Sequence, residues 1–280
     1  MTKDNRPISR TVELYFEGDM QALLGSGTRY ALIISNQDYP EGSGLNDLKT
    51  PHGDADALAQ VLRESFGFVN EAKLDGATVP LILRDATGLE IETALFNLSQ
   101  IAGEKDTVLV FYAGHGLYDA ATDKAYWLPS DTRMGLPFSF LAATAITDAL
   151  LRINANNILV ISDSCYSGAL MRGGNDLPES VTGDRLLALQ RLSDKRSRIV
   201  VASGGNEPVL DGGGGKHSVF AQALLTGLSE MEEDAFTVRE LFDRYLLPMT
   251  VGRAAQEPQY RPIQSSGHEG GDVVLARVSP

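Results

Sequence analysis

One histidine and the only cysteine of the chain follow two apolar runs. Residues 106–116 read DTVLVFYAGHG, and residues 158–168 read ILVISDSCYSG. Such runs are typical of strands buried on both faces of a parallel sheet, so His115 and Cys165 are each expected at a strand end. Functional sites of such sheets lie where the carboxyl ends of the strands meet. A thiolate is a strong nucleophile, and a nearby imidazole can take its proton and later protonate a leaving amine.

Each residue of this pair also has a simpler interpretation. A lone cysteine cannot form an internal disulfide or a multi-cysteine zinc site, so Cys165 is a buried inert thiol, an intermolecular link or a nucleophile. A lone histidine is usually a loop or core residue. Here His115 stands between Gly114 and Gly116, and Gly114 is expected to permit a turn that exposes the imidazole. Placement after two strands, fifty residues apart, favours a catalytic dyad.

Composition excludes several classes of protein. The chain has 280 residues, 43% of them hydrophobic, and a formal net charge of −13. This charge disfavours a general surface for nucleic acid or anionic membranes and favours cationic ligands. No apolar run approaches the roughly 20 residues of a membrane helix, and the amino-terminus lacks an apolar signal core. The sequence therefore predicts a globular cytoplasmic protein.

Strands and helices alternate along most of the chain. Strands are expected at residues 30–35, 79–84, 106–113, 157–162, 198–203 and 272–278. Helices are expected at residues 53–66, 88–103, 143–152, 218–231 and 237–250. This order predicts one continuous, mainly parallel sheet with helices on both faces. Residues 171–198 form a polar, exposed excursion with one short helix at RLLALQRL, and residues 1–28 form an extension.

AGHG and DSCYSG, in this order, resemble the caspase/metacaspase clan of cysteine peptidases, specifically its bacterial metacaspase-like (orthocaspase) members. Three further segments strengthen the resemblance: LKTPHGDADALAQVLRESFGF matches the first helix of the family, ASGGNEPVLDGGGGKHSVFAQALLTGL the start of its small subunit, and QEPQYRP a late loop. The resemblance implies a three-layer αβα caspase-like fold with a mainly parallel six-stranded sheet. It also implies a peptidase domain over 29–280, divided into a large-subunit-like part (29–170), a processing-type linker (171–198) and a small-subunit-like part (199–280).

The resemblance assigns roles to individual residues. Cys165 corresponds to the nucleophile and His115 to the general acid/base, while the amides of Gly116 and Cys165 would bind the oxyanion. No third orienting residue is evident, and the family generally works with a dyad. Asp54 and Asp163 match positions that line the pocket for the side chain before the scissile bond, where carboxylates would select Arg or Lys. The alternatives are a helix-terminal acid for Asp54 and a turn cap for Asp163.

Two positions depart from the usual metacaspase pattern. Ala113 stands where Ser often precedes Gly-His-Gly, and Tyr166 follows the cysteine where His is common. Both dyad residues are intact, so these two changes bear on fine substrate preference and not on the chemistry.

Other features concern regulation and ligands. Basic residues in the linker offer sites for self-cleavage or activation by another protease: Arg172, Arg185, Arg191, Lys195, Arg196 and Arg198. No motif requires a cofactor or metal. Many metacaspases are activated by calcium, which leaves calcium activation open although EF-hand spacing is absent. His52, His217 and His268 are expected to be exposed to solvent, and Gly212–Gly215 lacks the Lys-Ser/Thr of a phosphate-binding loop.

The sequence thus predicts a cysteine endopeptidase that hydrolyses protein bonds after Arg or Lys through a thioester on Cys165. A dormant zymogen activated by proteolysis is expected, with protein or peptide substrates and an activating protease or regulator as partners. The alternatives are a related peptidase of different specificity and a non-catalytic regulatory module of the same fold. A redox switch lacks a resolving cysteine within the chain. Bacterial relatives are tied to stress, cell death and anti-phage defence, and the sequence does not choose among these.

Overall fold

A six-stranded sheet forms the centre of the molecule. The computed structural model describes residues 27–164, 184–204, 215–251, 253, 257–263 and 265–278. In the sheet the strand order is β12-β10-β9-β5-β1-β4. The bounds of these strands are β1 (Arg29–Ser35), β4 (Ile82–Arg84), β5 (Thr107–Ala113), β9 (Asn157–Asp163), β10 (Ser197–Ala202) and β12 (Gln259–Pro262). Only β12 is antiparallel, so the predicted mainly parallel sheet is confirmed.

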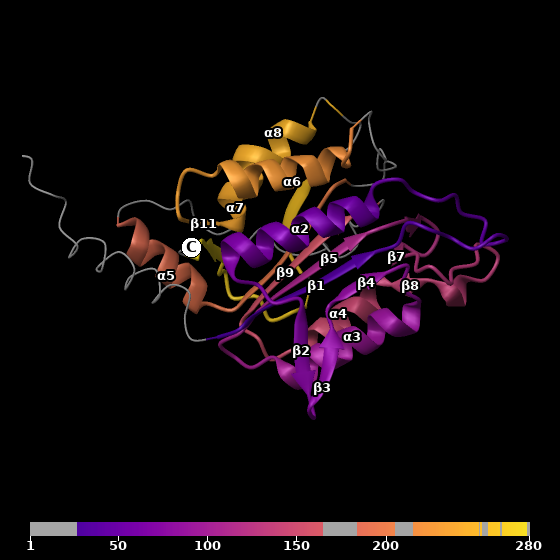
Figure 1. Cartoon of the computed structure of the whole chain (residues 1–280), viewed down its shortest axis with the longest axis horizontal. Coiled ribbons are helices and arrows are strands. Elements are labelled where there is room, and N and C mark those ends of the chain that lie inside the picture. Colours follow the sequence, from indigo (N-terminus) through magenta and orange to yellow (C-terminus); the bar gives the residue numbers. More distant parts are fainter. Residues whose placement is uncertain are drawn as a thin grey trace, which may run out of the picture.

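Helices cover both faces of the sheet, which confirms the three-layer architecture (Figure 1). One face carries α2 (Pro51–Phe66), α6 (Val219–Glu230) and a helical run made of α7 (Val238–Leu241), the π-helical η3 (Phe242–Leu246) and α8 (Leu247–Thr250). The other face carries α3 (Gly88–Ile101) and α4 (Ala143–Leu151). In the described part of the chain, no helix combines the length and hydrophobicity needed to cross a bilayer.

The double cover explains why the central strands are continuously apolar. Ile33 and Phe111 belong to the core cluster beneath α2 and α6. Their neighbours Leu32 and Val110 belong to the cluster beneath α3 and α4. Because successive side chains of a strand point to opposite faces, a strand buried on both sides needs an apolar residue at every position.

The segment predicted as one strand at 79–84 is divided. β3 (Ala77–Pro80) pairs antiparallel with β2 (Glu71–Leu74) in a hairpin outside the main sheet, whereas β4 joins β1. The hairpin turns at Asp75 and Gly76, which both have positive φ. An Asp-Gly pair suits a tight hairpin turn, so the sequence contained the signal for this correction.

The last predicted strand does not join the main sheet. β13 (Val274–Ala276) pairs antiparallel with β11 (Ala235–Thr237) in a separate two-stranded sheet. The sixth place is taken by β12, from the QYRP segment expected to be a loop. β12 lies at the edge of the sheet, where the missing N–H of Pro262 is tolerated.

The predicted exposed excursion at 171–198 is only partly correct. Its short helix is confirmed as α5 (Arg185–Asp194), and Arg191 and Lys195 are exposed while Arg196 is half-buried. Arg198, however, lies within β10 and is 1% exposed, so the expectation of an accessible processing site there is wrong. Arg185 forms an ion pair of 2.8 Å with Glu240. Arg172 lies outside the described residues, as does nearly all of the predicted extension at 1–28.

Candidate active site

Strand register brings the strands that precede the two predicted catalytic positions side by side, with their carboxyl ends at the same end of the sheet. In the parallel pair β5 and β9, Ala113 lies opposite Asp163. His115 follows Ala113 by two residues, and Cys165 follows Asp163 by two residues. Cys165 itself lies outside the described residues, and Ser164 is the last described residue before it. The two strands therefore end side by side, as expected from the sequence. The position of the Cys165 thiol stays a prediction.

The imidazole of His115 is oriented by a backbone carbonyl. Its Nε2 lies 2.8 Å from the carbonyl oxygen of Asn46. Because a carbonyl only accepts hydrogen bonds, Nε2 carries the proton in the neutral ring and Nδ1 carries the lone pair. Nδ1 is thus the atom of His115 that can act as a base. The Asn46 carbonyl could not be predicted from the sequence, because a main-chain oxygen carries no residue-type signal.

The backbone of His115 is held on both sides. Its N–H donates to the Tyr39 hydroxyl at 3.1 Å, and its carbonyl accepts from Leu128 N–H at 3.0 Å and from the Tyr112 hydroxyl at 2.8 Å. The ring of Tyr39 also contacts the imidazole, with a centroid distance of 4.9 Å. These contacts hold the backbone and the ring of His115 in a defined position.

Gly114 is needed for close approach. A Cβ at this position would lie 2.8 Å from the hydroxyl oxygen of Tyr112 and 3.2 Å from the Cβ of Asn36. The hydroxyl concerned is the one that binds the His115 carbonyl, so a side chain at Gly114 would displace that support. Gly116 begins β6 (Gly116–Asp119), which pairs antiparallel with β7 (Lys124–Trp127). Its predicted oxyanion role depends on Cys165 and stays a prediction.

A buried polar chain supports the residue before the predicted nucleophile. The hydroxyls of Ser162 and Ser164 lie 2.9 Å apart, and Trp127 Nε1 donates to the Ser162 hydroxyl at 3.2 Å. The indole of Trp127 stacks on the ring of Tyr112 with centroids 4.2 Å apart. Tyr112 therefore contacts both groups: its hydroxyl binds the His115 carbonyl, and its ring packs on Trp127, which binds Ser162. Trp127 is the last residue of β7.

The two predicted pocket acids come together, although neither contacts the other directly. Asp54 lies near the start of α2 and Asp163 at the end of β9, and both are buried. Ser218 joins them: its N–H donates to Asp54 Oδ2 at 3.3 Å and its hydroxyl donates to Asp163 Oδ2 at 2.5 Å. Asp54 Oδ1 lies 2.6 Å from His217 Nδ1. Burial raises the pKa of Asp54, and the hydrogen bonds from His217, Thr50 and Ser218 oppose that shift.

The expected exposure of the other three histidines is wrong. His52, His217 and His268 are all only partly exposed, and each has a polar partner. His217, with 13% of its side chain exposed, pairs with Asp54. Each partner lies far along the sequence or on the main chain, which explains why residue type and local spacing missed these contacts.

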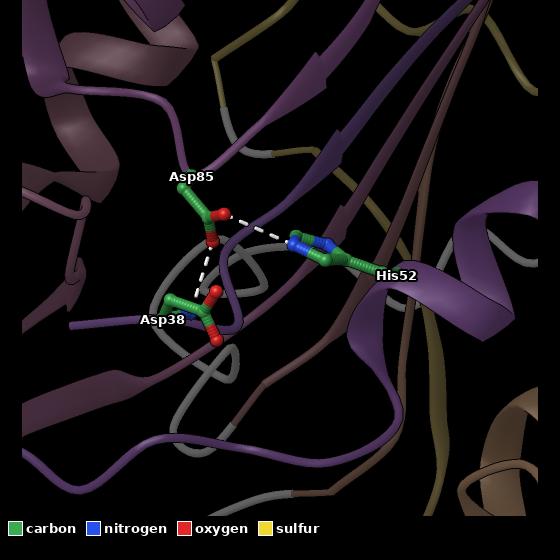
Figure 2. Close-up of side chains that lie close together, drawn as sticks. All are labelled: Asp38, His52 and Asp85. Atoms are coloured by element: carbon green, nitrogen blue, oxygen red, sulfur yellow. Dashed lines mark hydrogen bonds and ion pairs between the residues drawn. The ribbon is translucent and has the colours of Figure 1, made fainter.

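A second cluster braces the loop that carries Tyr39. Figure 2 shows His52 and Asp85 facing each other, with Asp38 beside them. Asp85 Oδ2 lies 3.0 Å from His52 Nε2, and Asp85 Oδ1 accepts the N–H groups of Gln37 and Asp38 at 2.8 and 2.9 Å. Burial acts to raise the pKa of Asp85, but these amides and His52 together lower it. His52 Nδ1 lies 3.0 Å from the Ser35 hydroxyl.

This cluster also has a spacing that suits a cation. Ligand atoms of Asp38, His52 and Asp85 lie within 4.8 Å of one another. Both oxygens of Asp85 already have hydrogen-bond partners in the protein, as does each imidazole nitrogen of His52. The hydrogen bonds of Asp85 to the main chain show that this cluster holds the loop at residues 37–39 in place.

The fold and the site together define a three-layer α/β protein with a base-competent histidine and buried acids at the carboxyl end of a parallel sheet. The sequence matches the family model Peptidase_C14, described as the caspase domain, over residues 28–266. The chain therefore belongs to the caspase domain family, a family of cysteine peptidases.

Solved structures and curated proteins give a narrower comparison. The chain is similar to protein GSU0716 from Geobacter sulfurreducens, with 19% sequence identity and a TM-score of 0.55, covering 86% of this chain and 97% of that one. At this identity the likeness shows the fold alone. No curated protein sequence matches the chain.

Proposed function

We propose that the protein is a cysteine endopeptidase that cleaves protein substrates after Arg or Lys through Cys165 and His115. Membership of the caspase domain family supports the reaction class. The observation that carries the proposal is the orientation of His115, whose Nε2 faces the Asn46 carbonyl and whose Nδ1 is thereby left with the lone pair. Cys165 is bonded directly to Ser164, which is buried at the neighbouring strand end.

The proposed reaction proceeds in two stages. His115 accepts the Cys165 proton, and the thiolate attacks the carbonyl carbon of the scissile bond. The oxyanion formed binds the amides of Gly116 and Cys165, after which the carbon–nitrogen bond breaks and His115 protonates the leaving amine. Water, deprotonated by His115, then attacks the thioester, and the sulfur leaves as the thiolate. The released products are a carboxylate and an amine.

The acids support the specificity that we propose. Asp54 and Asp163 lie next to the end of β9, and both are buried, so an incoming side chain that takes the place of one of their protein partners must suit their negative charge. An Arg side chain can do so with two parallel hydrogen bonds, and a Lys side chain with a compact ammonium. A neutral side chain that displaced such a partner would leave a buried carboxylate less well compensated, which is costly.

Regulation by proteolysis belongs to the same proposal. Arg191 and Lys195 are exposed on and just after α5, so a protease that cleaves after basic residues can approach them once this helix opens. Arg198 is excluded from this role because it is buried in β10. Incubating the wild type and Cys165→Ala separately, and mapping the fragments, distinguishes self-cleavage from cleavage by another protease.

A fluorogenic peptide panel tests the proposal. The residue before the reporter group is varied among Arg, Lys, citrulline and Asp, with and without calcium and after limited proteolysis. We expect Cys165-dependent cleavage of the Arg and Lys peptides and at least about 10²-fold weaker cleavage of the citrulline peptide, which lacks only the charge. Absence of Cys165-dependent cleavage of every peptide would favour the non-catalytic module instead. A preference for Asp would refute the acidic pocket.

A further inference from the structure

The side-chain partner of Asp54 Oδ1 in this structure is a histidine of the same chain. His217 precedes α6, and its Nδ1 lies 2.6 Å from Asp54 Oδ1. The side chain of Asp54 is 1% exposed, whereas that of His217 is 13% exposed. The imidazole is therefore the more accessible member of the pair. His217 thus binds the carboxylate with which the Arg or Lys side chain of a substrate would pair.

Both oxygens of Asp54 are engaged. Oδ1 binds His217, and Oδ2 accepts the N–H of Ser218 at 3.3 Å. Thr50 contributes a further side-chain hydrogen bond to Asp54. His217 and Ser218 differ in kind. Ser218 is fixed as the N-cap of α6, where its hydroxyl accepts from Ala221 N–H at 2.9 Å and donates to Asp163. His217 binds Asp54 through a side chain that can rotate away while the backbone of Ser218 stays in place.

We propose that His217 gates the acidic pocket: it binds Asp54 in the substrate-free protein and is replaced there by the Arg or Lys side chain of the substrate. This inference rests on the proposed function, since it concerns the same pocket. His217 is accordingly a specificity residue that contacts the acid and competes with the substrate side chain. Each substrate must release the imidazole before its own cation can bind Asp54.

The gate has a measurable cost. A hydrogen bond between ionised or polar partners in a partly buried site contributes enough to change an equilibrium constant by roughly tenfold. Removing the imidazole takes away one side-chain partner of Asp54, so a guanidinium binds without first displacing that ring. We therefore expect a lower KM for Arg and Lys peptides in His217→Ala, by about tenfold, at an unchanged kcat.

Binding can be measured without catalysis. Agmatine, which carries the guanidinium of Arg, is titrated into Cys165→Ala protein while the imidazole resonances of its four histidines are followed by NMR. His217→Gln in the same background identifies the His217 signal. We expect agmatine to shift that signal, and we expect Cys165→Ala/His217→Ala to bind agmatine about tenfold more tightly. His217→Gln, which keeps a donor but no imidazole, should lie between the two.

His268→Ala is the matched control. His268 is also partly buried and also has a hydrogen-bond partner. That partner is the N–H of Arg198 near the amino end of β10, whereas the predicted pocket lies at the carboxyl end of the sheet. We expect its agmatine affinity and KM to equal those of the parent protein. Melting curves of all variants show whether each is folded at the assay temperature.

The outcomes separate this inference from the proposed function. If Arg peptides are cleaved but folded His217→Ala and His217→Gln keep the wild-type KM, or raise it, the gate is refuted and the peptidase stands. If no peptide is cleaved but agmatine shifts the His217 signal and binds more tightly without His217, the gate stands and the peptidase is refuted. Absence of agmatine binding, or binding that leaves the His217 signal unchanged, overturns the gate.

Discussion

Charged side chains lie buried or half-buried at both ends of the central strands, but their partners differ. At the amino end, Arg29 donates to the carbonyls of Phe66 and Ala276 at 2.7 and 3.1 Å, and Arg198 donates to the carbonyl of Ile153 at 3.1 Å. Burial lowers the pKa of Arg29 and of Arg198 to about 10. Backbone carbonyls cannot move without moving the chain, so these contacts fasten neighbouring segments together.

At the carboxyl end the buried charges are acids with side-chain partners. Asp54 binds the imidazole of His217, and Asp163 binds the hydroxyl of Ser218. The imidazole of His217 can be exchanged for a ligand by rotation alone, whereas the Ser218 hydroxyl is also held as the N-cap of α6. A buried charge with at least one exchangeable side-chain partner can therefore serve a site, and one whose hydrogen bonds run to main-chain carbonyls fastens the structure.

The largest expected effect falls on activity at the carboxyl end. His115→Ala removes the proposed general acid/base, and we expect kcat to fall by about 10³-fold with little change in melting temperature. The His115 ring is only partly buried, so its removal leaves a small cavity. Steady-state kinetics and a melting curve test both statements. A folded His115→Ala protein with kcat near that of the wild type would contradict the role of His115.

The next effect is a pH dependence of stability near the amino end. Asp272 is fully buried, next to the segment that enters β10, and burial raises its pKa from 3.8 to about 7. Between about pH 4 and 7 the carboxyl of Asp272 is protonated in the folded protein and ionised in the unfolded chain. The stability that this proton contributes is therefore complete below about pH 4, and it is lost as the pH rises to about 7. The loss amounts to roughly 4 kcal/mol at most.

Asp272→Asn provides the check on this dependence. Chemical unfolding is measured from pH 4 to 8 for both proteins. As the pH rises, the unfolding free energy of the wild type should fall relative to that of the variant. The absolute stability of Asp272→Asn is a poorer test, because the amide cannot accept both N–H groups of Arg239 and Val273. A difference that is constant over this pH range would show that Asp272 is ionised throughout.

A smaller effect on stability is expected for Arg198. Arg198→Ala should lower the free energy of unfolding by about 3 kcal/mol, because a fully buried side chain is replaced by a cavity. Arg198→Met keeps most of the volume and removes a buried charge, so its cost should stay within about 1 kcal/mol. Urea unfolding measures both, and kcat should stay at the wild-type value in each. Equal destabilisation by the two variants would show that the guanidinium matters more than the packing.

The smallest effect concerns the support of His115. Tyr39→Phe keeps the ring against the imidazole but removes the hydroxyl that accepts the His115 N–H and donates to the Leu128 carbonyl at 3.1 Å. We expect kcat to fall by about tenfold at a nearly unchanged KM, as for a residue that positions the base. A matching loss of stability of about 1 kcal/mol is expected in thermal unfolding. An altered KM at constant kcat would assign Tyr39 to substrate binding instead.

Much of the fold could be predicted because its strongest signals are local. The apolar runs of β1, β5, β9 and β10 end within a residue or two of their predicted limits, since a doubly covered strand requires apolar residues throughout. β12 was missed because QYRP is short, polar in part and contains a proline. The hairpin at Asp75 and Gly76 was missed although its turn signal was present.

The site could be predicted only as far as side-chain type reveals it. Residue type and strand-end position indicated His115, and the family resemblance indicated Asp54 and Asp163. The register of β5 and β9 places Asp163 opposite Ala113, two residues before His115. The Asn46 carbonyl that orients His115 is a main-chain atom and has no signature. The pairing of Asp54 with His217 joins residues 163 positions apart, so it depends on how α6 packs beside α2 and not on any local pattern.

Trapping the nucleophile tests the central claim most directly. A peptidyl-arginine chloromethyl ketone is incubated with the protein, and the adduct is measured by intact mass and located by peptide mapping. The account predicts one adduct, on Cys165, that forms far more slowly in His115→Ala and more slowly when a neutral citrulline replaces Arg in the reagent. No adduct on Cys165, or labelling that is indifferent to both His115 and the charge of the reagent, would contradict it.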